Sequence, residues 1–294
     1  MLENILVLVR GADPAQPAVQ RAVLLAGRTT RLMLFDLVHE PMLDGYLGNS
    51  AIYESLRTRV VAERAEDLQR LVADLQGRGL TVEGEAVWGH PMDEAATKEA
   101  LARHADLVVI APGPESPGLT HNEWRLVSTC PAAVLVVKAR AQTNYRHIVA
   151  AVDPFHAHSK PGELDLAILS HADELRTRTR AMLTALHCFV PFEYFGSDLT
   201  QPVSDTFGDD ARRAELAKVL RQAGLPASIA RVEIGPTPEV IKALLDRGEV
   251  DVVVMGVLAR GRVKEWLVGS TAERVLQGVP VDVLAVKSSI RQEK

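Results

Sequence analysis

Short apolar runs alternate with longer amphipathic stretches along the chain. In its first half the apolar runs predict strands at Ile5–Val9, Leu32–Val38, Leu80–Val87, Leu107–Ala111 and Ala133–Lys138. The stretches between them have helical spacing and predict helices at Gln16–Ala26, Ser50–Gln76, Pro91–Arg103 and Glu123–Thr129. Nearly continuous apolar strands are typical of a parallel sheet that is buried on both faces.

The same pattern occurs a second time in the chain. The run "ADLVVIAP" from Ala105 returns as "VDVVVMGV" from Val250, 145 positions later. The run "CPAAVLVVK" from Cys130 returns as "VPVDVLAVK" from Val279, 149 positions later. Two copies of common domain size therefore fill the chain. We expect one domain over residues 1–140 and another over residues 144–294, joined by a polar stretch.

Strands that alternate with helices predict the α/β class with a doubly wound sheet. With right-handed crossovers and the common strand order 3-2-1-4-5, the first and fourth strands lie side by side where the order reverses. We therefore expect two doubly wound domains, each a five-stranded parallel sheet with helices on both faces. Ligands of such Rossmann-like sheets bind at this reversal, the switch point, outside the carboxyl ends of the strands.

Composition narrows the class of protein. The 294 residues, 47% hydrophobic and 24% charged, have the balance of a soluble protein with a sizeable core. A net charge of −5 argues against a broad nucleic-acid-binding surface. No run approaches the ~18 apolar residues of a membrane helix, and the N-terminal run is too short for a signal peptide. Cys130 and Cys188 have no metal-type spacing, so we expect reduced, buried thiols in a cytoplasmic protein.

The loop after the fourth strand is where the two copies differ most. The two offsets differ by four residues, so this loop, Gly256–Ser270, is longer in the second copy than in the first. It leads to a helix start, whose unpaired N–H groups and positive dipole end suit a phosphate, at ~0.3–1 kcal/mol per exposed charge. Arg260, Arg262 and Lys264 add positive charge. The loop therefore has the parts of a site for a nucleotide phosphate chain.

Asp153 follows the first strand of the second copy, beside this loop at the switch point. There its carboxylate is placed to hydrogen-bond the sugar or base of a nucleotide. A simpler interpretation makes the loop a plain connection and Asp153, Ser270 and Thr271 helix caps. A cap and a phosphate ligand are compatible, so both interpretations stay open for the two hydroxyl residues.

These residues resemble the universal stress protein family. Its nucleotide-binding members carry an aspartate after the first strand. After the fourth they carry glycine, two residues, glycine, nine residues, glycine and then Ser or Thr. The matching positions here are Asp153, Gly256, Gly269 and Ser270. Ala259 takes the place of the second glycine, with Gly261 two residues on, and Phe155 takes the place of a common serine. The resemblance covers the whole chain and is nearest to the tandem, two-domain E-type members of bacteria.

The resemblance implies a cytoplasmic stress-response protein that is regulatory rather than an enzyme, with at most slow ATP hydrolysis. It implies that ATP or a related nucleotide, with or without Mg²⁺, binds in the C-terminal domain only. The sequence has no Walker A lysine motif that would indicate another nucleotide chemistry. The expected contact residues are Ala151, Val152, Asp153, Met255, Gly256, Ala259, Arg260, Gly261, Arg262, Gly269, Ser270 and Thr271.

The first copy lacks the pattern. Arg10 stands where Asp153 stands, and His121 aligns with Ser270. Three prolines between positions 112 and 117 remove N–H donors from its loop. We therefore expect no nucleotide in the first copy, which has a structural role or another ligand.

A second hypothesis is a nucleotide-free interaction scaffold or a carrier of a small ligand, a lipid or metabolite. It rests on the degenerate first copy, on Ala259, and on the long segments Asp44–Arg59 and Phe195–Arg213, which we expect to line a groove or partner surface. His156 and His158 alternate, but no third ligand is evident, so we expect no metal site.

The duplication also bears on assembly. The last strands of the copies, Ala133–Lys138 and Asp282–Lys287, are edge strands and are expected to pair as an intramolecular pseudo-dimer. Whether two chains then form a homodimer stays open.

Overall fold

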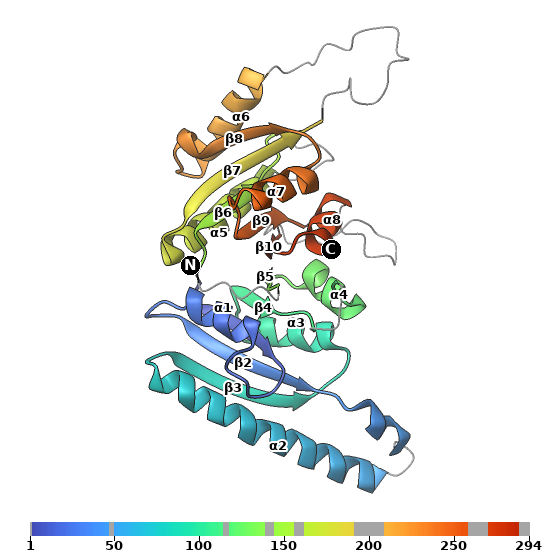
Figure 1. Cartoon of the computed structure of the whole chain (residues 1–294). Coiled ribbons are helices and arrows are strands. Elements are labelled where there is room, and N and C mark those ends of the chain that lie inside the picture. The colour runs from blue at the N-terminus through green and yellow to red at the C-terminus, as the bar shows by residue number, and fades with distance from the viewer. Residues whose placement is uncertain are drawn as a thin grey trace, which may run out of the picture. The chain divides into compact units, whose positions relative to one another are not determined.

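The computed structural model describes residues 2–46, 50–113, 118–138, 144–155, 162–190, 209–257 and 270–287 (Figure 1). At positions 44–46, 50, 209 and 270 it describes the backbone only. The chain divides into two compact units, residues 1–141 and 142–294, hereafter unit 1 and unit 2.

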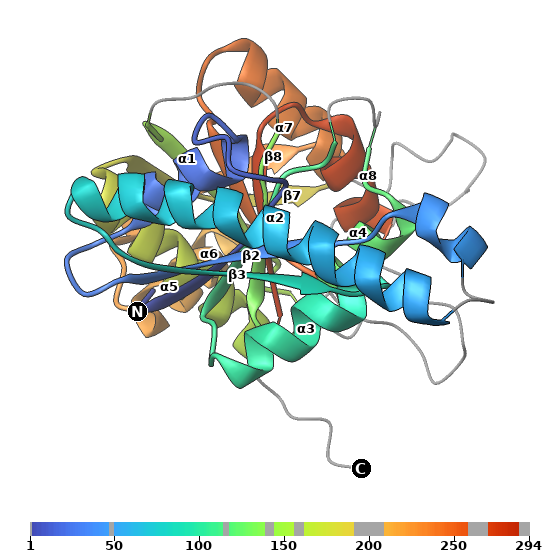
Figure 2. The same cartoon turned by 90° about the horizontal axis from the view of Figure 1, so that it is seen from below.

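Unit 1 is a five-stranded parallel sheet with helices on both faces. Its strands are β1 (Asn4–Val9), β2 (Arg31–Val38), β3 (Thr81–Trp88), β4 (Leu107–Ile110) and β5 (Ala133–Val136), in the spatial order β3-β2-β1-β4-β5. Its helices are α1 (Pro17–Leu25), α2 (Ser50–Gly77), α3 (Met92–Ala102) and α4 (His121–Thr129), with a short 3-10 helix η1 (Pro41–Tyr46) before α2. Figure 2 shows α1 and α2 on one side of this sheet and α3 on the other.

Unit 2 repeats the arrangement. Its strands are β6 (His147–Ala151), β7 (Met182–Phe189), β8 (Ala230–Ile234), β9 (Val252–Gly256) and β10 (Asp282–Val286), in the order β10-β9-β6-β7-β8. Its helices are α5 (Gly162–Thr179), α6 (Asp209–Gln222), α7 (Thr237–Asp246) and α8 (Ser270–Gly278), with a 3-10 turn η3 (Ala227–Ile229). The predicted α/β class with two doubly wound sheets is confirmed.

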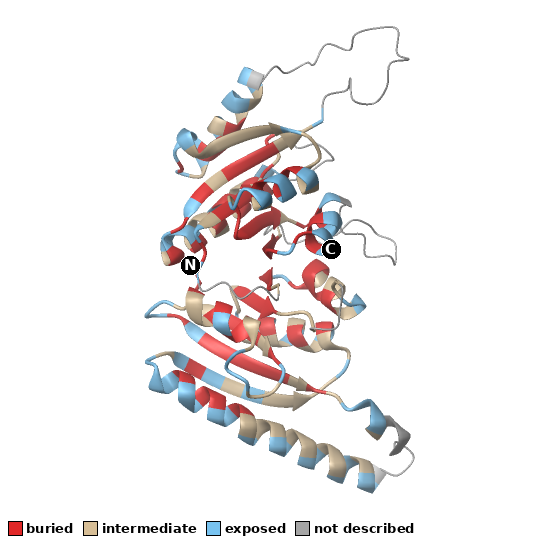
Figure 3. Cartoon of the chain, viewed as in Figure 1, coloured by how far each residue is buried: buried red, intermediate tan, exposed pale blue. Residues whose placement is uncertain are grey.

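The central strands form the core of each unit. Every residue of β4 and the first four residues of β9 are buried, which is why these strands read as apolar runs. Figure 3 shows buried residues along the strands and on the helix faces turned toward them. Burial of this apolar surface, at about 25 cal/mol per Å², is the main stabilising term for such a sheet.

One polar brace shows the duplication in atomic detail. Asp106 Oδ2 accepts hydrogen bonds from the backbone N–H groups of residues 3 and 4, at 2.8 and 2.9 Å. Asp251, 145 positions later, accepts from residues 146 and 147 at 2.6 and 2.9 Å. Both carboxylates fix the start of the central strand, so the two units share this part of their construction.

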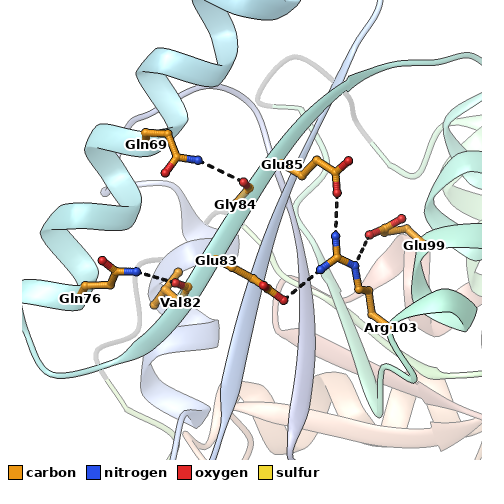
Figure 4. A network of polar contacts seen from close by, with 8 residues as sticks. All are labelled: Gln69, Gln76, Val82, Glu83, Gly84, Glu85, Glu99 and Arg103. Carbon is orange, nitrogen blue, oxygen red and sulfur yellow. Dashed lines mark hydrogen bonds and ion pairs between the residues drawn. The ribbon is translucent and has the colours of Figure 1, made fainter.

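The edge strand β3 is covered by polar side chains from two helices (Figure 4). From α2, the amide of Gln69 donates to the carbonyl oxygen of Gly84 at 3.2 Å, and that of Gln76 donates to Val82 at 2.8 Å. Arg103, the C-cap residue of α3, forms ion pairs with its neighbours Glu83, Glu85 and Glu99. Two outward carbonyl groups of β3 are therefore satisfied within unit 1.

The two long segments singled out in the sequence are described in part. In the first, residues 50–59 form the start of the 28-residue helix α2. In the second, positions 195–208 lie outside the described residues and positions 209–213 begin α6.

Cys188 was expected to be buried, and this is wrong, since it is only half-buried. It is the last residue but one of β7, on a strand next to the sheet edge, where cover is thinner.

Candidate functional site

The switch point of unit 2 lies between β6 and β9. Ala151 is paired with Met255, so the carboxyl ends of the two strands meet at the same edge of the sheet. Val152 and Asp153 follow directly after β6, and Gly256 ends β9. The structure thus brings together Ala151, Val152, Asp153, Met255 and Gly256. The predicted residues Ala259, Arg260, Gly261, Arg262 and Gly269 lie outside the described residues.

The helix after the loop begins at Ser270, so Ser270 and Thr271 are in the first turn of α8. In a right-handed crossover this helix runs antiparallel to the strands, and its N-terminus lies at their carboxyl ends. The third helical residue is Ala272, which is 4% exposed and carries no polar group.

Asp153 is half-buried in a turn after β6. Its backbone N–H donates to Oδ1 of Asp165 at 3.1 Å, and Asp165 is a buried residue in the first turn of α5. The alternative that Asp153 caps the next helix depends on positions 156–161, which lie outside the described residues, and the described part of α5 begins at Gly162. The bond to Asp165 holds the backbone of the turn and thereby sets the place of the Asp153 carboxylate.

Side chains of α5 leave no room for a Cβ atom at Gly256. A Cβ atom there would lie 2.6 Å from Leu164 Cδ2 and 3.2 Å from Ile168 Cδ1, both on α5. Real Cβ atoms do not approach so closely, so only glycine lets α5 pack this tightly on β9. The first glycine of the motif therefore has a packing role in addition to its place at the switch point.

Phe155 belongs to an aromatic cluster next to Asp153. Its ring centroid lies 5.5 Å from that of His187, a buried residue of β7. The guanidinium of Arg212, on α6, lies 3.8 Å from the ring centroid of Phe189 and 5.5 Å from that of Phe155. An arginine over an aromatic face is attracted by the ring quadrupole. We call these four residues the unit 2 aromatic cluster.

Sequence reasoning named only Phe155 of this cluster. His187 and Phe189 alternate near the end of β7, which puts both side chains on one face of the sheet. That alternation could have indicated that His187 and Phe189 lie together beside Phe155. Arg212 comes from a helix that follows a long connection, and no local pattern links it to the strand.

The switch point of unit 1 is closed by its own side chains. Thr120 is the N-cap of α4 and forms a capping box with Glu123. Glu123 Oε2 accepts from the backbone N–H of Thr120 at 2.7 Å and from its hydroxyl at 2.9 Å. Arg10 Nη2 lies 3.4 Å from the other carboxylate oxygen, Oε1. The Glu123 side chain is 3% exposed, so a buried negative charge stands at the helix start.

A second ion pair holds the neighbouring strand of unit 1. The Nε and Nη2 atoms of Arg64 donate to the two oxygens of Asp36, both at 2.8 Å. The backbone N–H of Gly11 also reaches Asp36, at 3.3 Å. The hydrogen bond with Asp36 raises the pKa of Arg64, against the opposing effect of desolvation. The pair is bidentate and its carboxylate is buried, so it holds α2 against β2.

The cavity at the switch point of unit 1 is small. It has a volume of about 80 Å³ and lies between Arg10, Met92, Ile110 and Glu123. That is room for a few water molecules, and it is well below the ~300–1,000 Å³ of ligand pockets.

Cys188 is a poor nucleophile. Burial raises the pKa of its thiol to about 12, with a smaller opposing effect from a hydrogen bond with Thr237. The thiolate is the reactive form, so at neutral pH this side chain is inert.

Within the described ranges no three His, Cys, Asp or Glu side chains gather in a way that could hold a metal ion. His156 and His158 lie outside those ranges. Among the described helices none is both long enough and apolar enough to cross a membrane.

Comparison with known proteins gives a family for both halves of the chain. A family model described as the Universal stress protein family matches residues 1–138 and again residues 144–287. Universal stress protein E of Escherichia coli (strain K12) is 25% identical over 98% of this chain and 94% of its own length.

Two solved structures extend over nearly the whole chain. A putative universal stress protein from Pseudomonas aeruginosa UCBPP-PA14 is 24% identical, with a TM-score of 0.73, over 98% of this chain and 94% of that one. A protein of unknown function from Pseudomonas aeruginosa PAO1 is 22% identical, with a TM-score of 0.70, over 98% and 93%. At these identities the likeness concerns the fold.

Proposed function

Because the chain belongs to the universal stress protein family, we propose that unit 2 binds ATP or a related nucleotide and that the protein is a cytoplasmic regulator rather than an enzyme. The observation that carries the proposal is the contrast between the two α-helices that follow the fourth strands. The first turn of α4 holds the carboxylate of Glu123, whereas the same turn of α8 has Ala272. The acidic residue in the first turn of α8, Glu273, is exposed, so the third helical position has no buried carboxylate of the kind that α4 has. Such a helix start, at a switch point, suits phosphate.

Each part of the nucleotide has a proposed partner in unit 2. The phosphates take the N–H groups and hydroxyls at the start of α8, with the positive charges of Arg260 and Arg262 from the loop. Asp153 accepts from the sugar hydroxyls. The base then extends across the end of β6 toward the unit 2 aromatic cluster, where stacking on a ring adds about 0.5–1.5 kcal/mol.

Calorimetric titration of the full chain with ATP, with and without Mg²⁺, tests the proposal. We expect one site per chain, binding at millimolar concentration or tighter, that is lost in Gly269→Val and weakened in Asp153→Ala. Asp74→Ala is the matched control, because Asp74 is an exposed residue of α2 in unit 1 whose described ion pair is with Arg78. No heat at millimolar nucleotide, with Gly269→Val indistinguishable from the parent, contradicts nucleotide binding.

The regulatory assignment is tested separately, by ATP turnover. We expect turnover below about one per minute, against ~10 s⁻¹ for a typical enzyme. Faster turnover that is abolished by Asp153→Ala would show that unit 2 is catalytic.

A second candidate is a nucleotide-free scaffold or carrier of a small ligand, and one feature of unit 1 favours it. Half-buried Trp88, at the end of β3, meets Tyr53 of α2 edge-on at 6.2 Å and His39 at 5.9 Å. His39 is stacked on His90 at 4.4 Å, and Met42 nearby in the chain is 84% exposed. Such a surface suits an apolar or planar ligand. Native mass spectrometry of the gently purified chain separates the two, since a co-purified metabolite or lipid favours the carrier and co-purified ATP counts against it.

The assembly expected from the sequence stays a prediction. Light scattering of the full chain gives its oligomeric state, and a mass of 32.0 kDa corresponds to one chain. A mass twice that value indicates a homodimer.

A further inference from the structure

The two helices that follow the fourth strands begin with different residues at equivalent positions. An offset of 149 residues aligns the N-cap Thr120 with Gly269 and the third helical residue Glu123 with Ala272. Unit 1 therefore has a complete capping box, of the pattern Thr-x-x-Glu, and unit 2 has neither of its two polar members.

Both oxygens of the Glu123 carboxylate have partners within unit 1. One oxygen accepts from both the N–H and the hydroxyl of Thr120, and the other faces Arg10 at 3.4 Å. The Glu123 side chain is 3% exposed and that of Arg10 is 62% exposed, so the carboxylate is buried at the helix start and its arginine partner lies on the surface. A phosphate bound at a helix start takes the same partners, namely backbone N–H groups, a hydroxyl and an arginine.

The charges around the two helix starts differ. Unit 1 has Arg10 after its first strand and Glu123 on the helix, whereas unit 2 has Asp153 and Ala272. The loop after β4 lies against Arg10, since a Cβ atom on Gly113 would be 2.7 Å from Arg10 Nη1. An incoming anion at α4 would therefore meet a buried negative charge whose counter-charge is already in use.

We propose that Glu123 is a built-in anion, whose carboxylate occupies in unit 1 the place that phosphate takes at the start of α8 in unit 2. The comparison with unit 2 rests on the proposed function. Glu123 and its partner Arg10 then determine specificity, because they keep nucleotides out of unit 1 and limit the chain to one bound nucleotide. In unit 1 the N–H and hydroxyl groups at the start of α4 are bonded to the Glu123 carboxylate, so they need no bound phosphate.

The first test removes the Glu123 carboxylate from unit 1. The parent for this test is Asp153→Ala/Gly269→Val, in which the proposed site of unit 2 is disabled, and the probe is inorganic triphosphate. Adding Glu123→Ala is expected to give a triphosphate-dependent rise in Tm and at least ten-fold tighter binding than the parent. A folded Glu123→Ala variant, judged by circular dichroism, that binds triphosphate no better than the parent overturns the proposal.

Glu123→Gln keeps the test decisive if Glu123→Ala does not fold. Glutamine also suits the third position of a capping box, so it keeps the cap while it removes the charge. Triphosphate binding at least ten-fold tighter than in the parent is expected here too, and binding equal to that of the parent counts against the proposal.

The second test adds a carboxylate at the start of α8 in the otherwise unchanged chain. Ala272→Glu brings the built-in anion to α8 and is expected to weaken ATP binding at least ten-fold relative to Ala272→Gln, which has a similar volume and no charge. Equal ATP affinity of the two variants overturns the proposal. If the unmodified chain binds no nucleotide, the proposed function fails, and the triphosphate test on unit 1 still decides the role of Glu123.

Discussion

In unit 1 the residue after the first strand is Arg10, and in unit 2 the equivalent residue is Asp153. The sixth residue of the second strand is Asp36 in β2 and His187 in β7. Asp36 is bound by Arg64, whereas His187 packs against Phe155. The two sheets have the same strand order, and in both an aspartate accepts hydrogen bonds at the amino end of the first strand. The two units therefore differ mainly at the carboxyl ends of the strands.

This contrast shows that two copies of a duplicated fold can keep the same strand order while the charged side chains of one copy pair with each other. In unit 1 the polar groups at the switch point form ion pairs and a helix cap among themselves. In unit 2 the corresponding positions carry a half-buried aspartate, an aromatic cluster and an alanine at the third position of the helix. The following experiments break or sharpen the contrast, from the largest expected effect to the smallest.

The largest effect is expected from Arg64→Ala in unit 1. It leaves the Asp36 carboxylate, which is 1% exposed, without its bidentate partner. Breaking such a pair from one side costs about 3 kcal/mol of unfolding free energy. Urea denaturation measures it, with Arg59→Ala on the same helix as the control. Arg59 is 69% exposed and its ion pair with Glu63 spans 3.9 Å, so the control is expected to lose less than about 0.5 kcal/mol. Equal losses in the two variants would show that the pair is not structural.

Gly256→Ala tests why the motif begins with glycine in unit 2. The added methyl group collides with Leu164, so we expect a loss of about 1–3 kcal/mol in unfolding free energy, measured by urea denaturation. In unit 1 the equivalent position is already an alanine, Ala111. Gly278→Ala is the control, because no atom outside its own helix lies within 4 Å of the added group. A stability unchanged by Gly256→Ala would mean that α5 does not pack closely on β9.

Cys188 gives unit 2 an alkaline limit of stability. Its pKa of about 12 in the folded chain exceeds the ordinary value of 9.0, so the unfolded chain loses its proton first as pH rises. The stability is complete below pH 9 and falls between pH 9 and 12, by up to ~1.4 kcal/mol per pH unit. Urea denaturation at pH 8 and pH 10 measures the fall, which Cys188→Ala is expected to reduce. Equal falls in the two proteins would refute this.

Phe155→Ala is expected to have the smallest effect and concerns the base. Loss of one stacking ring should weaken ATP binding by about 0.5–1.5 kcal/mol, up to roughly ten-fold, and leave inorganic triphosphate binding unchanged. Calorimetric titration with both ligands checks it, with inorganic triphosphate as the reference ligand that has no base. An equal loss for both ligands would assign Phe155 to the shape of the turn and not to the base.

The fold was predictable because its signals are local or periodic. Apolar runs of four to eight residues predicted the strands, and the rule that parallel strands end at one edge predicted that β6 and β9 end side by side. The duplication was readable from two matching pairs of strands. None of these inferences requires knowledge of which side chains touch.

The contacts that distinguish the two units were not predictable in the same way. The Asp36–Arg64 pair spans 28 positions and depends on how α2 lies on β2. Arg212 reaches the aromatic cluster from α6, which follows a long connection. The capping box of Glu123 was visible as Thr-x-x-Glu, but its meaning appears only when Arg10 is seen beside it.

The polar cover of the β3 edge bears on whether unfolded polypeptides can add to this sheet. An edge strand with unsatisfied carbonyl groups is a template for segments of unfolded chains. Gln69 and Gln76 already occupy two of these groups, and the charges of Glu83, Glu85 and Arg103 lie beside them (Figure 4). Unit 1 therefore offers unfolded polypeptides little to add to at this edge, which favours its remaining dispersed when other proteins aggregate.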